Sequence, residues 1–347
     1  MTTITTIFGS GLSDVAQRQE SYDLLRNFIA QNHDWNGGRA PDSDLLVCEL
    51  KKTLQKINDQ NFAFLLCHSG YIPEEYDHDS SEETIYTKLV EALVEEWARR
   101  IGFNETVLPK QKSSKEDVTI KDAENIIVCD AKSYRLGRSQ KAPNVKDALK
   151  EGDISKWLSA YCADSRTQLG GLITFPSQHD WSGGSDFYLY LTKKELPIVC
   201  LFYEHLAYVL LSGVTKQKLI DLYCNYDNLF PAQLKKSDGN KAKYWLKVLT
   251  HLFGDITEWN NFKSVAQTVI QEKVFHTIQD VKCHLSDIRD EISREIPVDA
   301  SAEDLREMLI EARCKLKTLS VSKQLSCIHK FRDHLESYIV MQEEDKN

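Results

Sequence analysis

Two acids and a lysine are spaced so that they could act together on a phosphodiester. The apolar run at residues 126–129 is typical of a buried strand and leads directly into Asp130-Ala131-Lys132. Because side chains two positions apart on a strand point to the same face, Asp130 and Lys132 should project together. A hairpin would place Asp117 on the neighbouring strand beside them. Two carboxylates could then hold Mg²⁺, and the lysine would face the attacking water and the phosphate.

An acid-x-lysine triplet is a weak signal by itself, because the chain contains others. Glu49-Leu50-Lys51 lies where apolar residues recur at helical spacing, which predicts a helix over residues 43–58. Asp280-Val281-Lys282 also follows helical spacing and is expected on a solvated helix face. Only the Asp130 triplet combines a strand-like run, an upstream acid and a basic segment downstream. A plain strand end with surface charges stays open as the alternative.

The segment from Glu116 to Arg138 resembles the active-site block of the HindIII restriction endonuclease family, a form of the PD-(D/E)xK nuclease signature. The matching stretches are Glu116-Asp117-Val118, Asp130-Ala131-Lys132 and the tail Ser133-Tyr134-Arg135-Leu136-Gly137-Arg138. Further matches occur in the same order at residues 83–88, at Trp157 and at residues 204–207. The resemblance covers roughly residues 80–250, and Glu116 stands where the signature has its proline.

The resemblance implies a type II restriction endonuclease that cuts double-stranded DNA at a short, palindromic site. It implies Mg²⁺ as cofactor, with Mn²⁺ as a substitute, held by Asp117, Asp130 and the backbone carbonyl of Ala131. Lys132 would orient or deprotonate the water, or stabilise the charge that develops on the phosphate. Glu83 is a further candidate ligand and Glu91 its alternative; an acid at the start of a helix is also explained by the helix dipole.

The charge pattern is consistent with a DNA partner although the net charge is −9. Residues 132–150 hold six cations against one anion, and residues 235–247 hold five cations against one. Such patches can confine a polyanion to one cleft, whereas charge runs are also common on solvated faces. The residues expected along DNA are Ser133, Tyr134, Arg135, Arg138 and Lys141. A homodimer and a DNA methyltransferase that acts on the same site are the expected protein partners.

The order of patterns predicts an α/β fold, with a central mixed β-sheet of the PD-(D/E)xK nuclease type flanked by helices. Strands are expected at about 117–121, 125–130, 170–175 and 197–202. Helices are expected at about 13–31, 43–58, 82–101, 204–212, 215–224, 241–254, 262–291, 302–318 and 322–342. The expected regions are a helical N-terminal part (1–80), a nuclease core (81–255) and a helical C-terminal part (256–347) packed with the core.

Composition narrows the class of protein further. The 347 residues are 41% hydrophobic, which is enough for a large core. Nine scattered cysteines without a Cys-x-x-Cys pair, and no recognisable signal or membrane segment, suggest the bacterial cytoplasm. The chain lacks a phosphate-binding Gly-x-x-x-x-Gly-Lys loop and a Gly-x-Ser-x-Gly elbow. The remaining alternatives are a PD-(D/E)xK nuclease of DNA repair or of another defence system, and a catalytically silent DNA-binding or scaffold protein.

Overall fold

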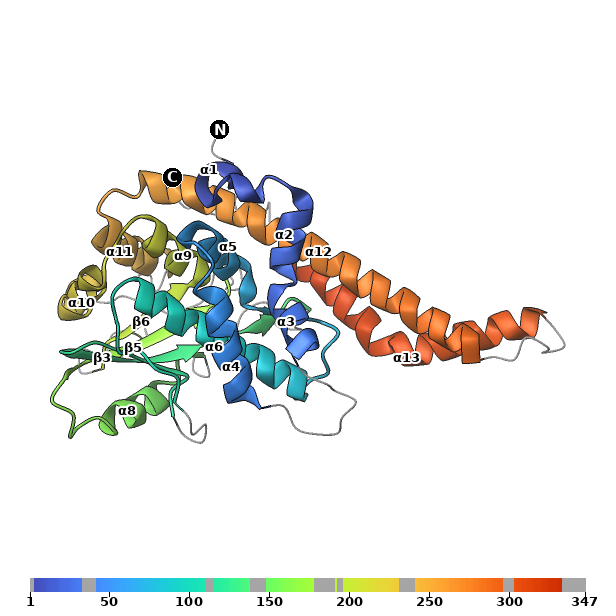
Figure 1. The fold of residues 1–347 in the computed structure, drawn as a ribbon, viewed down its shortest axis with the longest axis horizontal. Coiled ribbons are helices and arrows are strands. Elements are labelled where there is room, and N and C mark those ends of the chain that lie inside the picture. The colour runs from blue at the N-terminus through green and yellow to red at the C-terminus, as the bar shows by residue number, and fades with distance from the viewer. Residues whose placement is uncertain are drawn as a thin grey trace.

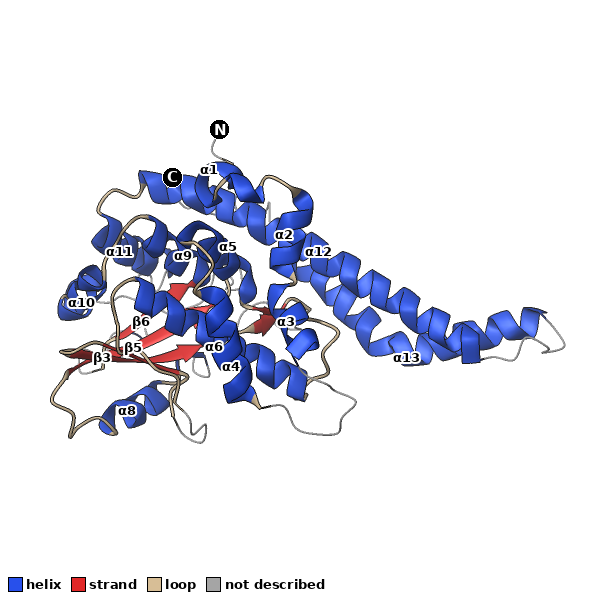
Figure 2. Cartoon of the chain, viewed as in Figure 1, coloured by secondary structure: helices blue, strands red, loops and turns tan. Residues whose placement is uncertain are grey.

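The computed structural model describes residues 3–32, 42–109, 115–137, 148–177, 191, 196–230, 241–295 and 303–332. These residues form a body built around a sheet and a long helical arm that extends from it (Figure 1). The central sheet is mixed and four-stranded, and helices surround it (Figure 2). The predicted α/β fold with a central mixed sheet is therefore confirmed.

The central sheet has the strand order β2-β3-β5-β6. β2 (Val118–Lys121) runs antiparallel to β3 (Asn125–Ala131), and β5 (Thr167–Phe175) and β6 (Ile198–Phe202) continue the sheet parallel to β3. Residues 126–130 of β3 are all buried. A strand covered on both faces needs apolar side chains on both, which is why β3, β5 and β6 were visible as continuous apolar runs.

Helices cover both faces of this sheet (Figure 1). α5 (Asp59–Ser69), α6 (Ser81–Arg100) and α9 (Tyr203–Leu211) lie on one side, and α8 (Glu151–Ser159) lies on the other. α8 packs closely on β5 because Gly171 has no side chain: a Cβ there would be 2.7 Å from Ile154 Cγ2. The predictions included neither α5 nor α8.

The N-terminal helices are α1 (Ile4–Phe8), α2 (Val15–Tyr22), α3 (Leu24–Asn32) and α4 (Ser43–Leu54). The single helix expected at 13–31 is wrong, because the chain turns at Asp23, whose carboxylate binds Arg26 and His276. The remaining helices of the body are α10 (Lys216–Cys224), α11 (Lys241–Phe253) and the short 3-10 turns Ser10–Leu12 and Tyr226–Leu229.

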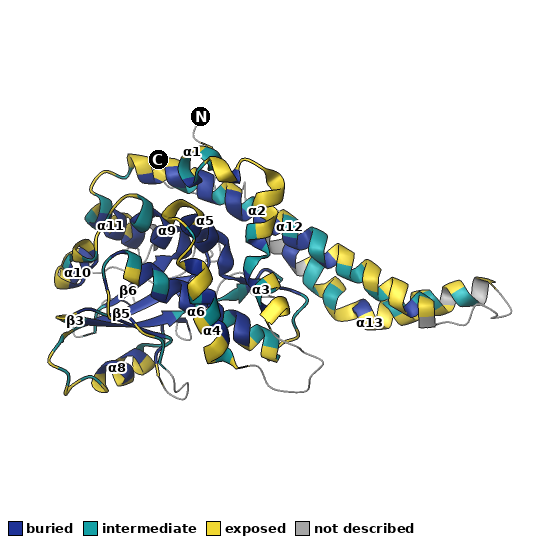
Figure 3. Cartoon of the chain, viewed as in Figure 1, coloured by how far each residue is buried: buried dark blue, intermediate teal, exposed yellow. Residues whose placement is uncertain are grey.

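The arm is a hairpin of two long helices, α12 (Thr257–Glu295) and α13 (Glu303–Arg332). Its far half is largely exposed, whereas α12 is buried where it crosses the body (Figure 3). Two helices were expected at 302–318 and 322–342, and this is wrong up to Arg332: α13 is continuous, since no glycine or proline interrupts residues 319–322. Residues 333–342 lie outside the described part of the chain.

A second, smaller sheet fastens the arm to the body. It pairs β1 (Tyr71–Ile72) in parallel with β4 (Tyr134–Arg135). Around it lies a hydrophobic cluster that we call the arm-base cluster: Tyr71, Leu136, Ile270, Val274, Ile278, Val281 and Ile328. The arm is therefore anchored to the segment that directly follows β3. Among the described helices, we find none that combines the length and the apolar character that a membrane span requires.

Candidate active site

The hairpin of β2 and β3 brings Asp117 and Asp130 together. The backbone N–H of Asp117 donates to the Cys129 carbonyl over 2.9 Å, so Asp117 extends the pairing of β2 with β3. Asp117 Oδ2 accepts a hydrogen bond from the Ala131 N–H over 2.8 Å. The two carboxyl groups are close enough for the charge of Asp130 to raise the pKa of Asp117. Both acids are thus held by backbone geometry at one end of the strand pair.

Lys132 is fixed beside them. Its Nζ lies 2.6 Å from Asp130 Oδ2. Its backbone N–H donates to the Thr174 carbonyl over 2.9 Å, and its carbonyl accepts from the Tyr203 hydroxyl over 3.2 Å. Burial lowers the pKa of Lys132, and the charge of Asp130 opposes this effect. No sequence pattern pointed to Thr174 or Tyr203, because their contacts depend on how β5 and α9 pack.

Negative charge is crowded around Asp117. The pKa of Asp117 is raised from its ordinary value of 3.8 to about 8, mainly by burial and also by the nearby charges of Glu91 and Asp130. Glu91 comes from α6 and is paired with Lys88. Glu91 is therefore a third carboxylate, after Asp117 and Asp130, whose charge affects this end of the strand pair.

Glu83, one of the two helix acids weighed from the sequence, has other partners. Its Oε2 accepts from the Asp79 N–H over 2.6 Å, and its Oε1 lies 3.1 Å from Arg135 Nη2. The Ser80 side chain caps α6 by accepting from the Glu83 N–H. Of the two acids, Glu91 therefore acts on Asp117, while Glu83 binds the Asp79 N–H and pairs with Arg135.

The residues predicted to lie along DNA differ in their contacts within the protein. Arg135 is 6% exposed, and it also donates to the carbonyls of Pro73 and Asp77, so it holds β4 in place. The ring of Tyr134 stacks on Phe175 with centroids 6.4 Å apart. The Ser133 hydroxyl has no hydrogen-bond partner among the described residues. Arg138 and Lys141 lie outside the described residues.

Glu116 occupies the proline position of the signature. Its carboxylate binds a side chain of the neighbouring strand β2. Its Oε1 accepts from the Thr119 hydroxyl over 2.7 Å and from the Tyr161 hydroxyl. Glu116 is buried, so both contacts are shielded from water. With its carboxylate engaged in this way, Glu116 stabilises β2 next to Asp117.

The competing triplet Glu49-Leu50-Lys51 lies on helix α4, as expected. Lys51 Nζ lies 2.5 Å from Glu95 Oε2 of α6, and Leu50 is buried. Side chains two positions apart on a helix, such as Glu49 and Lys51, point in different directions. This triplet therefore does not reproduce the arrangement at Asp130.

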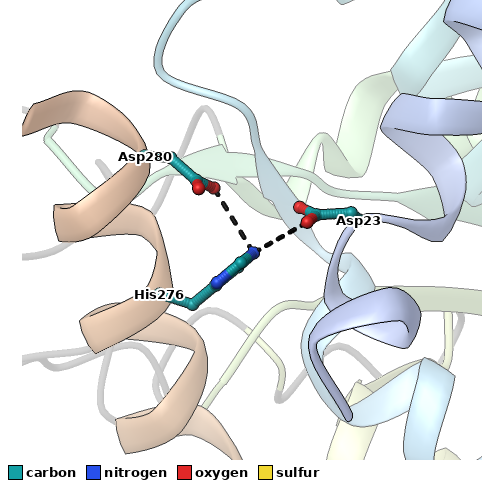
Figure 4. Close-up of side chains that lie close together, drawn as sticks. All are labelled: Asp23, His276 and Asp280. Carbon is teal, nitrogen blue, oxygen red and sulfur yellow. Dashed lines mark hydrogen bonds and ion pairs between the residues drawn. The ribbon is translucent and has the colours of Figure 1, made fainter. Parts of the chain in front are cut away.

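The triplet at Asp280 is also helical, and Lys282 is exposed as expected, whereas Asp280 is only partly exposed. Asp280 meets His276 and Asp23 in a cluster whose geometry could suit a metal ion (Figure 4). His276 Nε2 lies 2.9 Å from Asp23 and 3.4 Å from Asp280. Arg26 already binds both carboxylates, at 2.9 Å and 3.2 Å. Since their charge is compensated, we interpret the cluster as a network that ties α12 to the turn between α2 and α3.

A comparison with known families identifies the class of protein. The sequence model of the family described as HindIII restriction endonuclease matches residues 26–320. The chain belongs to the HindIII restriction endonuclease family. Membership makes it a site-specific DNA nuclease, with DNA as its substrate. No protein with curated annotation matches the chain.

The HindIII-family match extends well beyond the stretch that the sequence resemblance covered. It begins in α3 and ends in α13, so it includes most of the arm. It also spans Asp117, Asp130 and Lys132, which lie in its first half.

Proposed function

We propose that this HindIII-family chain is a type II restriction endonuclease that cuts double-stranded DNA at a short palindromic sequence. The observation that carries the proposal is the meeting of Asp117, Asp130 and Lys132 at the end of β2 and β3. Two acids and one lysine, held by backbone hydrogen bonds, suit hydrolysis of a phosphodiester.

The donor set fits Mg²⁺, because carboxylate oxygens crowd one strand end and Mg²⁺ prefers oxygen ligands. Asp117, Asp130 and the Ala131 carbonyl would hold the ion, and Glu91 is the better candidate than Glu83 for a further, outer contact. Mn²⁺ should substitute for Mg²⁺, since it accepts similar oxygen ligands. A bound ion would supply Lewis-acid activation of the phosphate and of a water molecule.

Lys132 would supply a positive side chain at the site, in addition to the charge of the metal ion. Its ammonium lies against Asp130, so it would face the same phosphate that the acids face. There it would orient or deprotonate the water, or stabilise the charge that develops on the phosphate. The backbone contacts with Thr174 and Tyr203 hold this lysine in position before substrate arrives.

The proposed assembly is a homodimer with one such site in each subunit, because palindromic DNA is read by two-fold symmetric proteins. A DNA methyltransferase that modifies the same sequence in the bacterial cytoplasm would protect the host DNA. Ser133, Arg138 and Lys141 are the proposed DNA contacts of the segment after β3, whereas Arg135 would support that segment from behind. Light scattering of the free protein and of its DNA complex measures the subunit number, and a monomer in both states contradicts the dimer.

Digestion of mixed-sequence plasmid DNA with Mg²⁺ tests the activity. Discrete fragments support restriction, a smear supports a nonspecific or repair nuclease, and uncut DNA in every condition supports a silent DNA-binding protein. Asp130→Asn and Lys132→Ala should each slow cleavage by about 10²–10³-fold, since each removes one preorganised charged group.

The matched control is the exposed pair Glu49 and Lys52 on α4, whose charged atoms lie 2.6 Å apart. Glu49→Gln and Lys52→Ala should leave cleavage within a few-fold of wild type. Lys51 is unsuitable as a control because it pairs with the buried Glu95. If the α4 variants are inactive while the β3 variants still cut, the active site lies elsewhere.

A further inference from the structure

Lys150 is a second cation at the strand end. It is the residue that precedes α8, and its Nζ lies 3.9 Å from Asp130 Oδ1. Lys132 occupies the other oxygen of the same carboxylate, at 2.6 Å. Asp130 therefore lies between two lysines that reach it from different segments: Lys132 directly follows β3, and Lys150 directly precedes the helix on the other face of the sheet.

The position of Lys150 is set by the packing of α8. Ile154 of α8 is fully buried and sits over Gly171 of β5. Trp157, one turn further along, is also buried, and its ring centroid lies 5.9 Å from the Lys150 ammonium. An ammonium at this distance is attracted to the face of an indole ring, so Trp157 helps to direct the side chain.

The backbone of Lys150 is unusual for its residue type. Its φ of 43° and ψ of 39° lie in the left-handed region, where Asp79 is the other non-glycine residue that the described structure places at positive φ. The residue before a helix normally has extended backbone angles. A side chain with a Cβ keeps the left-handed conformation only where its surroundings impose it, and such positions cluster at functional sites.

Lys150 is also the more accessible of the two lysines. Its side chain is 39% exposed, compared with 15% for Lys132. Its contact with Asp130 is the longer of the two, and that contact would weaken further when Asp130 shares its charge with a metal ion. A partly exposed lysine beside the two acids is a point charge that substrate can reach, which is how lysine recognises phosphate.

We propose that Lys150 contacts the phosphate that is cut, through a non-bridging oxygen, as a second substrate-binding lysine. The inference rests on the proposed nuclease function and assigns its substrate contact. Lys132 would act at the reacting centre from its largely buried position after β3, and the more exposed Lys150 would hold the phosphate. No other described residue of α8 reaches Asp130 in an ion pair.

The test compares Lys150→Ala with Lys156→Ala, a change of an exposed lysine on the same helix. Single-turnover cleavage of plasmid DNA by Lys150→Ala should slow by about 10²-fold. The slope of log affinity for DNA against log salt should fall by about one, because one phosphate contact is lost. Lys150→Arg should restore most of the salt slope. Lys156→Ala should match wild type in both measurements.

A chemical variant of the substrate tests the contact without relying on the fold of a mutant. Sequencing of the fragment ends locates the cut, and a duplex is made with an uncharged methylphosphonate at that linkage. Lys150→Ala should bind this duplex as tightly as wild type does, because the contact is already absent. Equal loss on both duplexes overturns the proposal, as does a cleavage rate for Lys150→Ala equal to that of Lys156→Ala. If wild type itself leaves plasmid DNA uncut with Mg²⁺, the nuclease function fails instead.

Discussion

The two acids of α6 have different partners, and their variants should differ accordingly. Glu91→Gln removes a charge that acts on Asp117, so cleavage should need more Mg²⁺, and stability should also fall because the buried Lys88 loses its carboxylate. Glu83→Gln leaves the buried Arg135 without its carboxylate, which should lower stability by about 1–3 kcal/mol. A Mg²⁺ titration of the cleavage rate and a thermal melt of each variant separate the two effects. A changed Mg²⁺ requirement in Glu83→Gln with an unchanged one in Glu91→Gln would show that Glu83 is the acid of the active site.

The raised pKa of Asp117 makes the stability of the metal-free protein depend on pH. The carboxyl has a pKa of about 8 in the folded state, mainly through burial, against 3.8 ordinarily, so the folded state binds more protons between these values. Stability should therefore fall as pH rises through this window, by up to about 1.4 kcal/mol per pH unit. Melts across this range should show the slope, and Asp117→Asn should remove it.

Mg²⁺ provides the complementary measurement. A metal ion binds the deprotonated carboxylates, so it should raise the melting temperature more at pH 8 than at pH 5. Equal stabilisation at both values would mean that the ion binds away from Asp117.

At the scale of single residues, the sequence predicted those site residues that are close together along the chain. Asp130 and Lys132 share one strand, and Asp117 is one hairpin away, so the two-residue period of a strand brings them together. The difference between Glu83 and Glu91 could not be predicted, because it depends on which turn of α6 lies over β2. Lys150 was visible only as a member of a basic run, since its contact requires α8 to pack on β5.

At the scale of elements, the contact between α8 and β5 should control the position of Lys150. Gly171→Ala would place a Cβ 2.7 Å from Ile154 Cγ2, so α8 must shift. Overpacking of this kind typically costs about 1–3 kcal/mol, and cleavage should slow because Lys150 moves with the helix. Thermal melts and cleavage rates measure the two effects together.

Gly152 offers the control, since it lies on α8 and a Cβ there would meet no atom within 4 Å. Gly152→Ala should stabilise the protein by up to about 1 kcal/mol, because alanine favours a helix. Unchanged stability and cleavage in Gly171→Ala would mean that α8 adjusts without moving Lys150.

Elements were predictable where their apolar pattern is long. β3, β5 and β6 each contain several successive buried residues, so their strand character could be read directly. β1 and β4 have two residues each, which is too short to show any period, and their pairing joins segments far apart in the chain. The turn at Asp23 depends on tertiary contacts of its carboxylate. The continuity of α13 follows from the lack of glycine and proline at residues 319–322.

At the scale of the whole molecule, the arm depends on its base. Ile328 of α13 is fully buried in the arm-base cluster, and Ile328→Ala should cost about 2–5 kcal/mol of the free energy that docks the arm. Leu316 of the same helix is 77% exposed, and Leu316→Ala should change stability by no more than about 0.5 kcal/mol. Hydrogen exchange should show lost protection in α13 and β4 for the first variant only. Protection lost in α13 alone would mean that β4 does not depend on the arm.

The close passage of α13 over Gly137 restricts how chain length can vary among related proteins. A Cβ at Gly137 would lie 3.0 Å from the carbonyl oxygen of Gln324, so the register of α13 is fixed at this point. One residue inserted between Leu316 and Gln324 would rotate Leu316 relative to the fixed base by about 100°, and the helix toward Glu303 would turn with it. There the hairpin is largely solvent-exposed, and whole turns added to both helices would leave the base in place (Figure 3). We therefore expect insertions and deletions to accumulate away from the base, while the spacing from Lys132 to Gly137 and from Gln324 to Ile328 stays constant.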